Sequence, residues 1–99
     1  MADQKSTAEL VAATQEALID FLRTDLAMCV TFADLAETEL GLDRQGALEA
    51  FKRAERGYEI IEQFVMRVQD TTKRQEIEQK MNLLRSRLAT LEASPNSAG

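Results

Sequence analysis

Two stretches of this chain repeat apolar residues at alternating intervals of three and four. The longer stretch holds Ala47, Phe51, Ala54, Tyr58, Ile61, Val65 and Val68, and the shorter holds Ile77, Met81, Leu84, Leu88 and Leu91. This spacing lines one face of an α-helix, and an apolar helix face needs a partner helix to cover it. Because no stretch alternates apolar and polar residues between turn signals, strands are not expected. The sequence therefore predicts an all-α fold.

The composition agrees with long helices. The chain has 99 residues, of which only four are Gly and one is Pro, and helix-forming residues dominate the rest. This length fits one domain with a modest core. We expect a single helical domain over residues 1–99, with helices at about 7–40, 44–69 and 73–92 and a disordered tail at 93–99.

Local signals set these boundaries. Ser6 and Glu9 have the spacing of a capping box, in which each side chain bonds to the backbone amide of the other. Gly41 is expected to end the first helix in the left-handed conformation, and Asp43 to cap the second helix. Thr72 begins a second capping box at the start of the third helix. Connections this short predict an antiparallel bundle that runs up, down and up.

The first helix is longer than its neighbours can cover. At 1.5 Å per residue it spans about 50 Å and the second helix about 40 Å, so coverage ends near Thr14. The beginning of the first helix then overhangs, bends or meets another chain.

The apolar arc of the first helix is also wide. It exceeds half of the circumference, whereas a surface helix needs about 100°. Packing against both other helices explains such an arc, and so does a second interface, most simply a two-fold homodimer. Leu26 and Val30 lie at one edge of the arc, and Met28 and Leu35 at the other. These four residues are the first candidates for an interface.

The second helix adds two more interface candidates, Ile60 and Phe64, which lie outside its main apolar face. They either meet the third helix or form the edge of an exposed groove. Gly57, in mid-helix, costs about 1 kcal/mol relative to Ala. It either allows another backbone to approach closely or is a tolerated accident.

Asp25 points into the middle of the apolar arc, where a carboxylate needs a partner. It caps a helix break at Thr24, pairs with Arg67 or Arg85 to set the register of the bundle, or is a functional carboxylate. Apolar residues on both sides of this point stay in phase, which favours an unbroken helix. No second acid completes an acid–base pair with Asp25.

The residue types present argue against catalysis. The chain has no His, which excludes the ordinary Ser-His and Cys-His pairs and His-bearing metal motifs. The single Cys29 lies in an apolar stretch and is expected to be a small core residue. We expect no catalytic residues, no metal site, no cofactor and no small-molecule substrate.

Charge is distributed unevenly along the chain. Residues 1–43 hold nine acids and two bases, whereas residues 44–99 hold ten bases and eight acids, for a net charge of −5. We expect the first helix to attract the later ones. Binding to nucleic acid is not expected from an acidic chain whose bases have no aromatic neighbours. No signal peptide or membrane-spanning stretch is visible, and one unpaired cysteine fits a reducing compartment, so the expected location is the cytoplasm.

Residues 46–54 resemble the second helix of a tetratricopeptide repeat, in the small–aromatic–small pattern of Ala47, Phe51 and Ala54. The segment from Ala33 to Gly41 resembles the first helix of that repeat. The long third helix is similar to that of the microtubule-interacting and trafficking domain, which has three helices and binds peptide helices in its grooves. The resemblance implies a helical hairpin suited to binding another helix.

The expected function is that of a non-catalytic protein–protein interaction module. It would form a homodimer or bind a partner helix by coiled-coil-like packing of the wide face of the first helix, with Asp25 setting the register. The alternative is a structural or assembly subunit of a larger helical complex.

Overall fold

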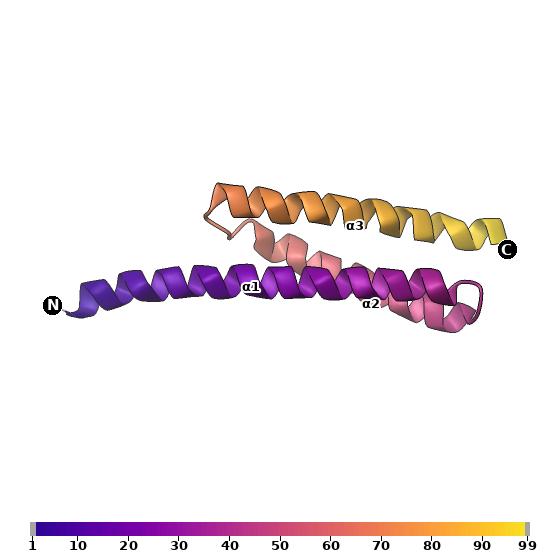
Figure 1. Ribbon diagram of the computed structural model, residues 1–99, viewed down its shortest axis with the longest axis horizontal. Coiled ribbons are helices and arrows are strands. Elements are labelled where there is room, and N and C mark those ends of the chain that lie inside the picture. The colour runs from indigo at the N-terminus through magenta and orange to yellow at the C-terminus, as the bar shows by residue number, and fades with distance from the viewer. Residues whose placement is uncertain (1, 99) are drawn as a thin grey trace.

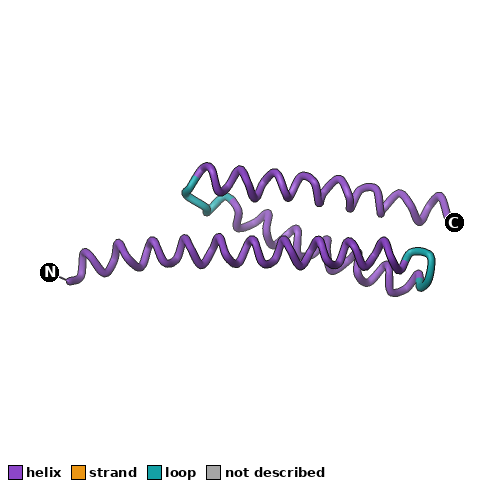
Figure 2. The backbone as a smooth tube through the Cα atoms, in the orientation of Figure 1, coloured by secondary structure: helices purple, strands orange, loops and turns teal. Residues whose placement is uncertain are grey.

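The computed structural model describes the backbone of residues 2–98 and the side chains of residues 14–93. This part of the chain forms three helices and no strand: α1 (Ala2–Glu39), α2 (Arg44–Val65) and α3 (Thr71–Ala98). The helices run antiparallel in sequence order, and short loops join them at opposite ends (Figures 1 and 2). The prediction of an all-α, three-helix bundle is confirmed. The bundle is elongated, with a longest axis of 66 Å.

The loop between α1 and α2 corrects one local prediction. The carbonyl of Glu39 accepts bonds from the amides of Leu42 (2.9 Å) and Asp43 (2.7 Å), so the end of α1 is satisfied by ordinary right-handed turns. Gly41 consequently needs no positive φ and has none, and the left-handed conformation predicted for it is wrong. Asp43 is confirmed as the N-cap of α2, because its Oδ1 accepts a bond from the amide of Gln45 at 3.1 Å.

The loop between α2 and α3 begins earlier than predicted. α2 ends at Val65 instead of residue 69, and the amide of Val68 bonds to the Val65 carbonyl at 3.1 Å in a tighter turn. This turn places Val68 in the core, where it is 1% exposed. The N-cap of α3 is Asp70 and not Thr72, since Asp70 Oδ1 accepts a bond from the amide of Lys73 at 3.0 Å.

The outer ends of α1 and α3 both extend past the predicted limits. α1 begins at Ala2, so Ser6 lies inside the helix and not at its N-cap, and the side chains of Ser6 and Glu9 lie outside the described residues. α3 continues to Ala98, which corrects the tail predicted at 93–99. That tail was inferred from polar composition, which is a poor guide to where a helix ends.

The core contains the apolar seams that the sequence predicted. On α3, the five seam residues from Ile77 to Leu91 are all 6% exposed or less. The buried residues of α2 are mostly small, and α1 adds a mixed set. The core residues of these two helices are Ile19, Leu22, Leu26, Cys29, Ala33, Ala36, Ala50, Ala54, Ile61 and Val65. Small residues on both helices let α1 and α2 approach closely.

Gly57 marks the tightest point of that approach. A Cβ at this position would overlap the Sγ of Cys29, which is itself 2% exposed. Gly57 is therefore not a tolerated accident, but the group that needs the space is the side chain of Cys29 and not another backbone, as the sequence had suggested.

α1 extends beyond the rest of the bundle at its N-terminal end (Figure 1). Gln15 marks where coverage stops: its Nε2 donates to the carbonyl of Arg67 at 3.1 Å, and its Oε1 accepts from the amide of Gln69 at 2.9 Å. These bonds join the α2–α3 loop to α1 at Gln15. The helix lengths predicted that coverage of α1 would end near Thr14, one residue away. The backbone of residues 2–13 projects past this loop.

Ion pairs join α1 to α3 across the bundle. Arg87 on α3 contacts Asp34 at 2.6 Å and Glu37 at 2.9 Å, and Arg23 on α1 contacts Glu76 at 3.1 Å. The predicted attraction between the first helix and a later one is thus confirmed.

Candidate interaction surfaces

One edge of the α1 arc is covered by the chain itself. Leu26 is 3% exposed and belongs to the core, and Val30 is half-buried against it. The prediction of Leu26 as an interface residue is corrected, because α3 packs along this edge and shields its side chain. Val30 keeps partial exposure at the border between α1 and α3.

The border between α1 and α3 is hollowed into a groove of about 490 Å³. Its floor is apolar and includes Leu26, Val30 and Leu84, and Leu83 on α3 lines it while remaining 69% exposed. All the charged side chains that line this α1–α3 groove are basic; they are Arg23, Lys80 and Arg87.

The other edge of the α1 arc is bare. Met28 is 51% exposed and Leu35 is 45% exposed, and Phe21, at 43%, lies on the same side of α1. These three residues follow one another at intervals of seven, so they form one row along the helix. Sequence reasoning overlooked Phe21 as an interface candidate, although the interval of seven before Met28 would have revealed it.

The second helix continues this apolar surface. The rings of Phe21 and Phe64 meet edge to face, with centroids 6.2 Å apart, which places Phe64 of α2 beside the row on α1. Phe64 is half-buried, and Ile60, one turn earlier, is 37% exposed. We call the surface formed by Phe21, Met28, Leu35, Ile60 and Phe64 the α1–α2 flank. Four of the six predicted interface candidates belong to it.

Two arginines, one on α2 and one in the α2–α3 loop, lie against aromatic rings at this side of the bundle. The Cζ of Arg67 lies 4.8 Å from the Phe64 centroid, and that of Arg53 lies 5.7 Å from the centroid of Phe32 on α1. Both distances are typical of cation–π contacts. Among the described side chains neither arginine has an ion pair. The flank is thus apolar, with one basic side chain beside it on α2 and another in the α2–α3 loop.

Asp25 does not play the role expected of it. α1 continues unbroken through Thr24 and Asp25, so no helix cap forms there. Asp25 has no ion pair with Arg67, Arg85 or any other described side chain, and it is only partly buried. The register prediction is wrong because a partly exposed carboxylate keeps its contact with water and needs no buried partner.

Asp25 does act on Cys29, one turn away. The pKa of the Cys29 thiol is raised above its ordinary value of 9.0, first by burial and second by the negative charge of Asp25. The thiol is therefore protonated and a poor nucleophile at neutral pH, in keeping with a core residue. No charged or polar side chain is buried in the described part of the chain.

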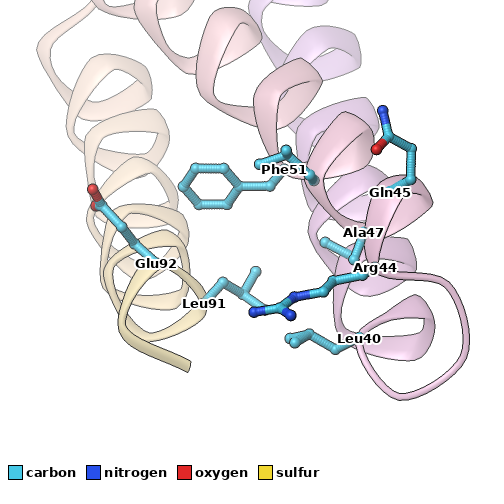
Figure 3. Close-up of a pocket in the computed structure, with 9 residues that line it drawn as sticks. Leu40, Arg44, Gln45, Ala47, Phe51, Leu91 and Glu92 are labelled. Carbon is cyan, nitrogen blue, oxygen red and sulfur yellow. The ribbon is translucent and has the colours of Figure 1, made fainter. Parts of the chain in front are cut away.

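A cavity of about 350 Å³ lies between the end of α1, the start of α2 and the C-terminal part of α3. Leu40, Ala47, Phe51 and Leu91 supply apolar walls. In Figure 3, Arg44 extends from α2 toward Leu91 on α3, whereas Glu92 points away from the space between the helices. Within residues 14–93, Arg44 has no ion pair.

The described residues contain no group of three or more His, Cys, Asp or Glu side chains placed to hold a metal ion. None of the three helices, over that same part of the chain, combines the length and the apolar character needed to cross a bilayer.

We found no match to this chain among protein-family models, curated proteins or solved structures. The surfaces themselves must therefore carry any argument about function.

Proposed function

We propose that this protein is a non-catalytic interaction module that forms a homodimer through its α1–α2 flank. The observation that carries the proposal is the exposed row of Phe21, Met28 and Leu35 on α1, which Phe64 of α2 joins at Phe21. Exposed apolar patches that continue across two elements mark interaction sites more often than scattered single residues do. The described residues include no buried polar or charged side chain, so no such group among them favours a catalytic role.

The spacing of the row favours a second copy of the chain as partner. Met28 lies midway between Phe21 and Leu35, so in an antiparallel pair Met28 would meet its own counterpart on the two-fold axis. Phe21 of each copy would then lie against Leu35 of the other. A two-fold interface requires this kind of self-complementarity.

Charge supports the same arrangement. Arg53 of α2 and Arg67 of the α2–α3 loop lie beside the flank, while residues 1–43 hold most of the acids of the chain. An approaching α1 from a second copy would bring acids toward these arginines. A stable dimer buries about 800 Å² per partner, more than a few half-exposed side chains supply. We therefore expect a weak dimer.

Analytical ultracentrifugation over a range of concentrations tests the proposal. The wild-type chain should shift from monomer to dimer as concentration rises, and Met28→Glu should remain a monomer with unchanged helical circular dichroism. Leu83→Glu is the matched control, because Leu83 is 69% exposed on the α3 side of α1, outside the flank. A wild-type chain that is monomeric at every concentration, or a Met28→Glu dimer as strong as wild type, would contradict the proposal.

The projecting start of α1 favours a second candidate, an assembly subunit of a larger helical complex. Residues 2–13 extend past the α2–α3 loop, and a projecting helix offers a surface for other helices to join. In that case the chain would co-purify from its native source in a stoichiometric complex of different subunits. A cytoplasmic location is part of our proposal and is supported by the single, buried, unpaired Cys29. The resemblance to helix-binding hairpins stays a prediction.

A further inference from the structure

We propose that the α1–α3 groove binds an acidic, amphipathic peptide segment of a partner protein. This site lies on the α3 side of α1, apart from the α1–α2 flank, so it is independent of the proposed dimer. Three features of the groove support the inference: its apolar floor, the exposure of Leu83, and the sign of the charges that line it.

The floor suits apolar side chains. Leu26 and Leu84 close it from below, and Val30 remains half-exposed at its side. Its volume of about 490 Å³ lies in the range of about 300–1,000 Å³ that ligand pockets have. Leu83 is 69% exposed although it lines this groove, so an occupant would remove a large apolar side chain from water.

The charged side chains that line the groove favour a partner with negative charge. Arg23 projects from α1, and Lys80 and Arg87 project from α3, so bases flank the floor from both helices. Three acids pair with the two arginines, Glu76 with Arg23 and both Asp34 and Glu37 with Arg87, and none of the three is among the residues that line the groove.

These bases can exchange their present partners for those of a ligand. Exposed ion pairs contribute only about 0–1 kcal/mol, and the side chains of Asp34, Glu37 and Glu76 are 63%, 51% and 56% exposed. Lys80 has no ion pair with any described side chain, because Glu76, one turn before it, turns to Arg23 instead. Among the described side chains, Lys80 therefore offers a cation that is not already in an ion pair.

The same features argue against other anionic partners. A nucleic acid would need stacking aromatics, which this groove lacks, and the net charge of −5 would repel a polyanion. An anionic membrane attracts about 1 kcal/mol per base, too little from three bases on an acidic chain. A peptide that alternates apolar residues with acids over two helical turns uses both the floor and the bases.

Fluorescence anisotropy with a designed peptide tests this proposal. The labelled probe is a helical peptide with Leu at intervals of three and four and Glu on both flanks, and the comparison peptide has Gln in place of every Glu. We expect the acidic probe to bind the full chain about tenfold more tightly at low salt, with the difference shrinking at high salt.

Variants of the chain locate the binding site. Lys80→Glu should weaken binding of the acidic probe about five- to tenfold, and Leu83→Ala should weaken both peptides about threefold. Lys52→Glu on α2 makes the same charge change at an exposed position outside the groove and should leave binding close to wild type. Circular dichroism checks that each variant folds, and Leu83→Ala is safe in this respect because Leu83 is mostly exposed.

Other outcomes would overturn the proposal. These are no binding of the acidic probe, equal binding of the Gln peptide, and full binding by both Lys80→Glu and Leu83→Ala. Stronger binding of anionic vesicles or of duplex DNA than of the probe would also overturn it. Met28→Glu should bind the probe normally even when it abolishes the dimer, so failure of one proposal is distinguishable from failure of the other.

Discussion

The two edges of the α1 arc have the same apolar character in sequence but different environments in the structure. Leu26, at one edge, is 3% exposed, whereas Met28, at the other, is 51% exposed. The width of an apolar arc therefore predicts how much helix surface is unfavourable in water. It does not predict which side of that surface the other helices of the chain will bury. In this bundle α3 covers one side, and the proposed partner would cover the other.

The two edges of α1 differ in exposure because α2 and α3 pack different side chains against them. α3 presents Leu84 beside Leu26, and its Arg87 pairs with Asp34 of α1. α2 packs closely on α1 through small residues such as Gly57, and on the bare side Phe64 contacts Phe21. Met28 and Leu35 thus lie beyond the apolar side chains that α2 provides.

Truncating one residue at each edge tests this comparison most strongly. Leu26→Ala should lower the free energy of unfolding by about 2–5 kcal/mol, because it leaves a cavity in the core. Met28→Ala should change the free energy of unfolding of the monomer by less than about 0.5 kcal/mol. Urea titrations at low protein concentration measure both. Similar losses would mean that the two edges are equally covered within one chain.

Gly57→Ala tests the closeness of α1 and α2, which sets where the bare edge begins. The added methyl meets Cys29 Sγ, which is enclosed by the core and has little freedom to move. We expect a loss of about 1–3 kcal/mol in thermal or urea unfolding, against a helix-propensity gain of at most about 1 kcal/mol.

Two controls accompany this substitution. Gly41→Ala should be close to neutral, since no atom lies within 4 Å of a Cβ built there. Adding Cys29→Ala to Gly57→Ala should recover part of the loss by removing the overlapping sulfur. A stabilised single Gly57→Ala variant would show that the helices have room to spare.

Arg87→Met tests whether charge or apolar packing covers the α3 edge. Because Arg87 and both of its acidic partners keep contact with water, we expect a loss of at most about 1 kcal/mol, which 1 M salt should reduce further. Arg85→Met, at an exposed position of α3 without an ion pair among the described residues, is the control. A loss as large as that of Leu26→Ala would show that the ion pairs hold α3 in place.

The smallest effect is expected from the titration of Cys29. Its pKa in the folded chain is raised above the ordinary 9.0, so the contribution of the buried thiol is complete below pH 9. That contribution is lost as pH rises through the folded pKa, because the unfolded chain ionises first.

Urea titrations of the wild type and of Cys29→Ala between pH 8 and pH 10 measure this contribution. The wild type should lose more stability than the variant over that range. Equal slopes would mean that the thiol is as accessible to water as in an unfolded chain.

Local chemistry made several features predictable from the sequence. The α3 seam follows from its spacing alone, and Asp43 caps α2 because a short carboxylate reaches the amide two residues on. The end of coverage near Thr14 follows from helix lengths. The α2–α3 loop was less predictable, because Val68 leaves the helix to reach the core and Asp70 becomes the cap.

The candidate interaction surfaces were also predictable from the sequence only in part. Met28, Leu35, Ile60 and Phe64 were recognised from periodicity as apolar positions outside a simple seam, and they all lie on the α1–α2 flank. Leu26 had the same pattern and is in the core. The basic lining of the α1–α3 groove was not predictable, because Arg23 comes from a different helix than Lys80 and Arg87.

By itself, the sequence determined that three helices form, roughly where they turn and which faces are apolar, because these properties depend on residues within a few turns of one another. Only the tertiary structure decided which edge of α1 is shielded and which is bare. That choice depends on the sizes of side chains that meet across helices, and in this bundle Gly57 against Cys29 and Leu84 beside Leu26 place α2 and α3 so that Met28 and Leu35 stay in water.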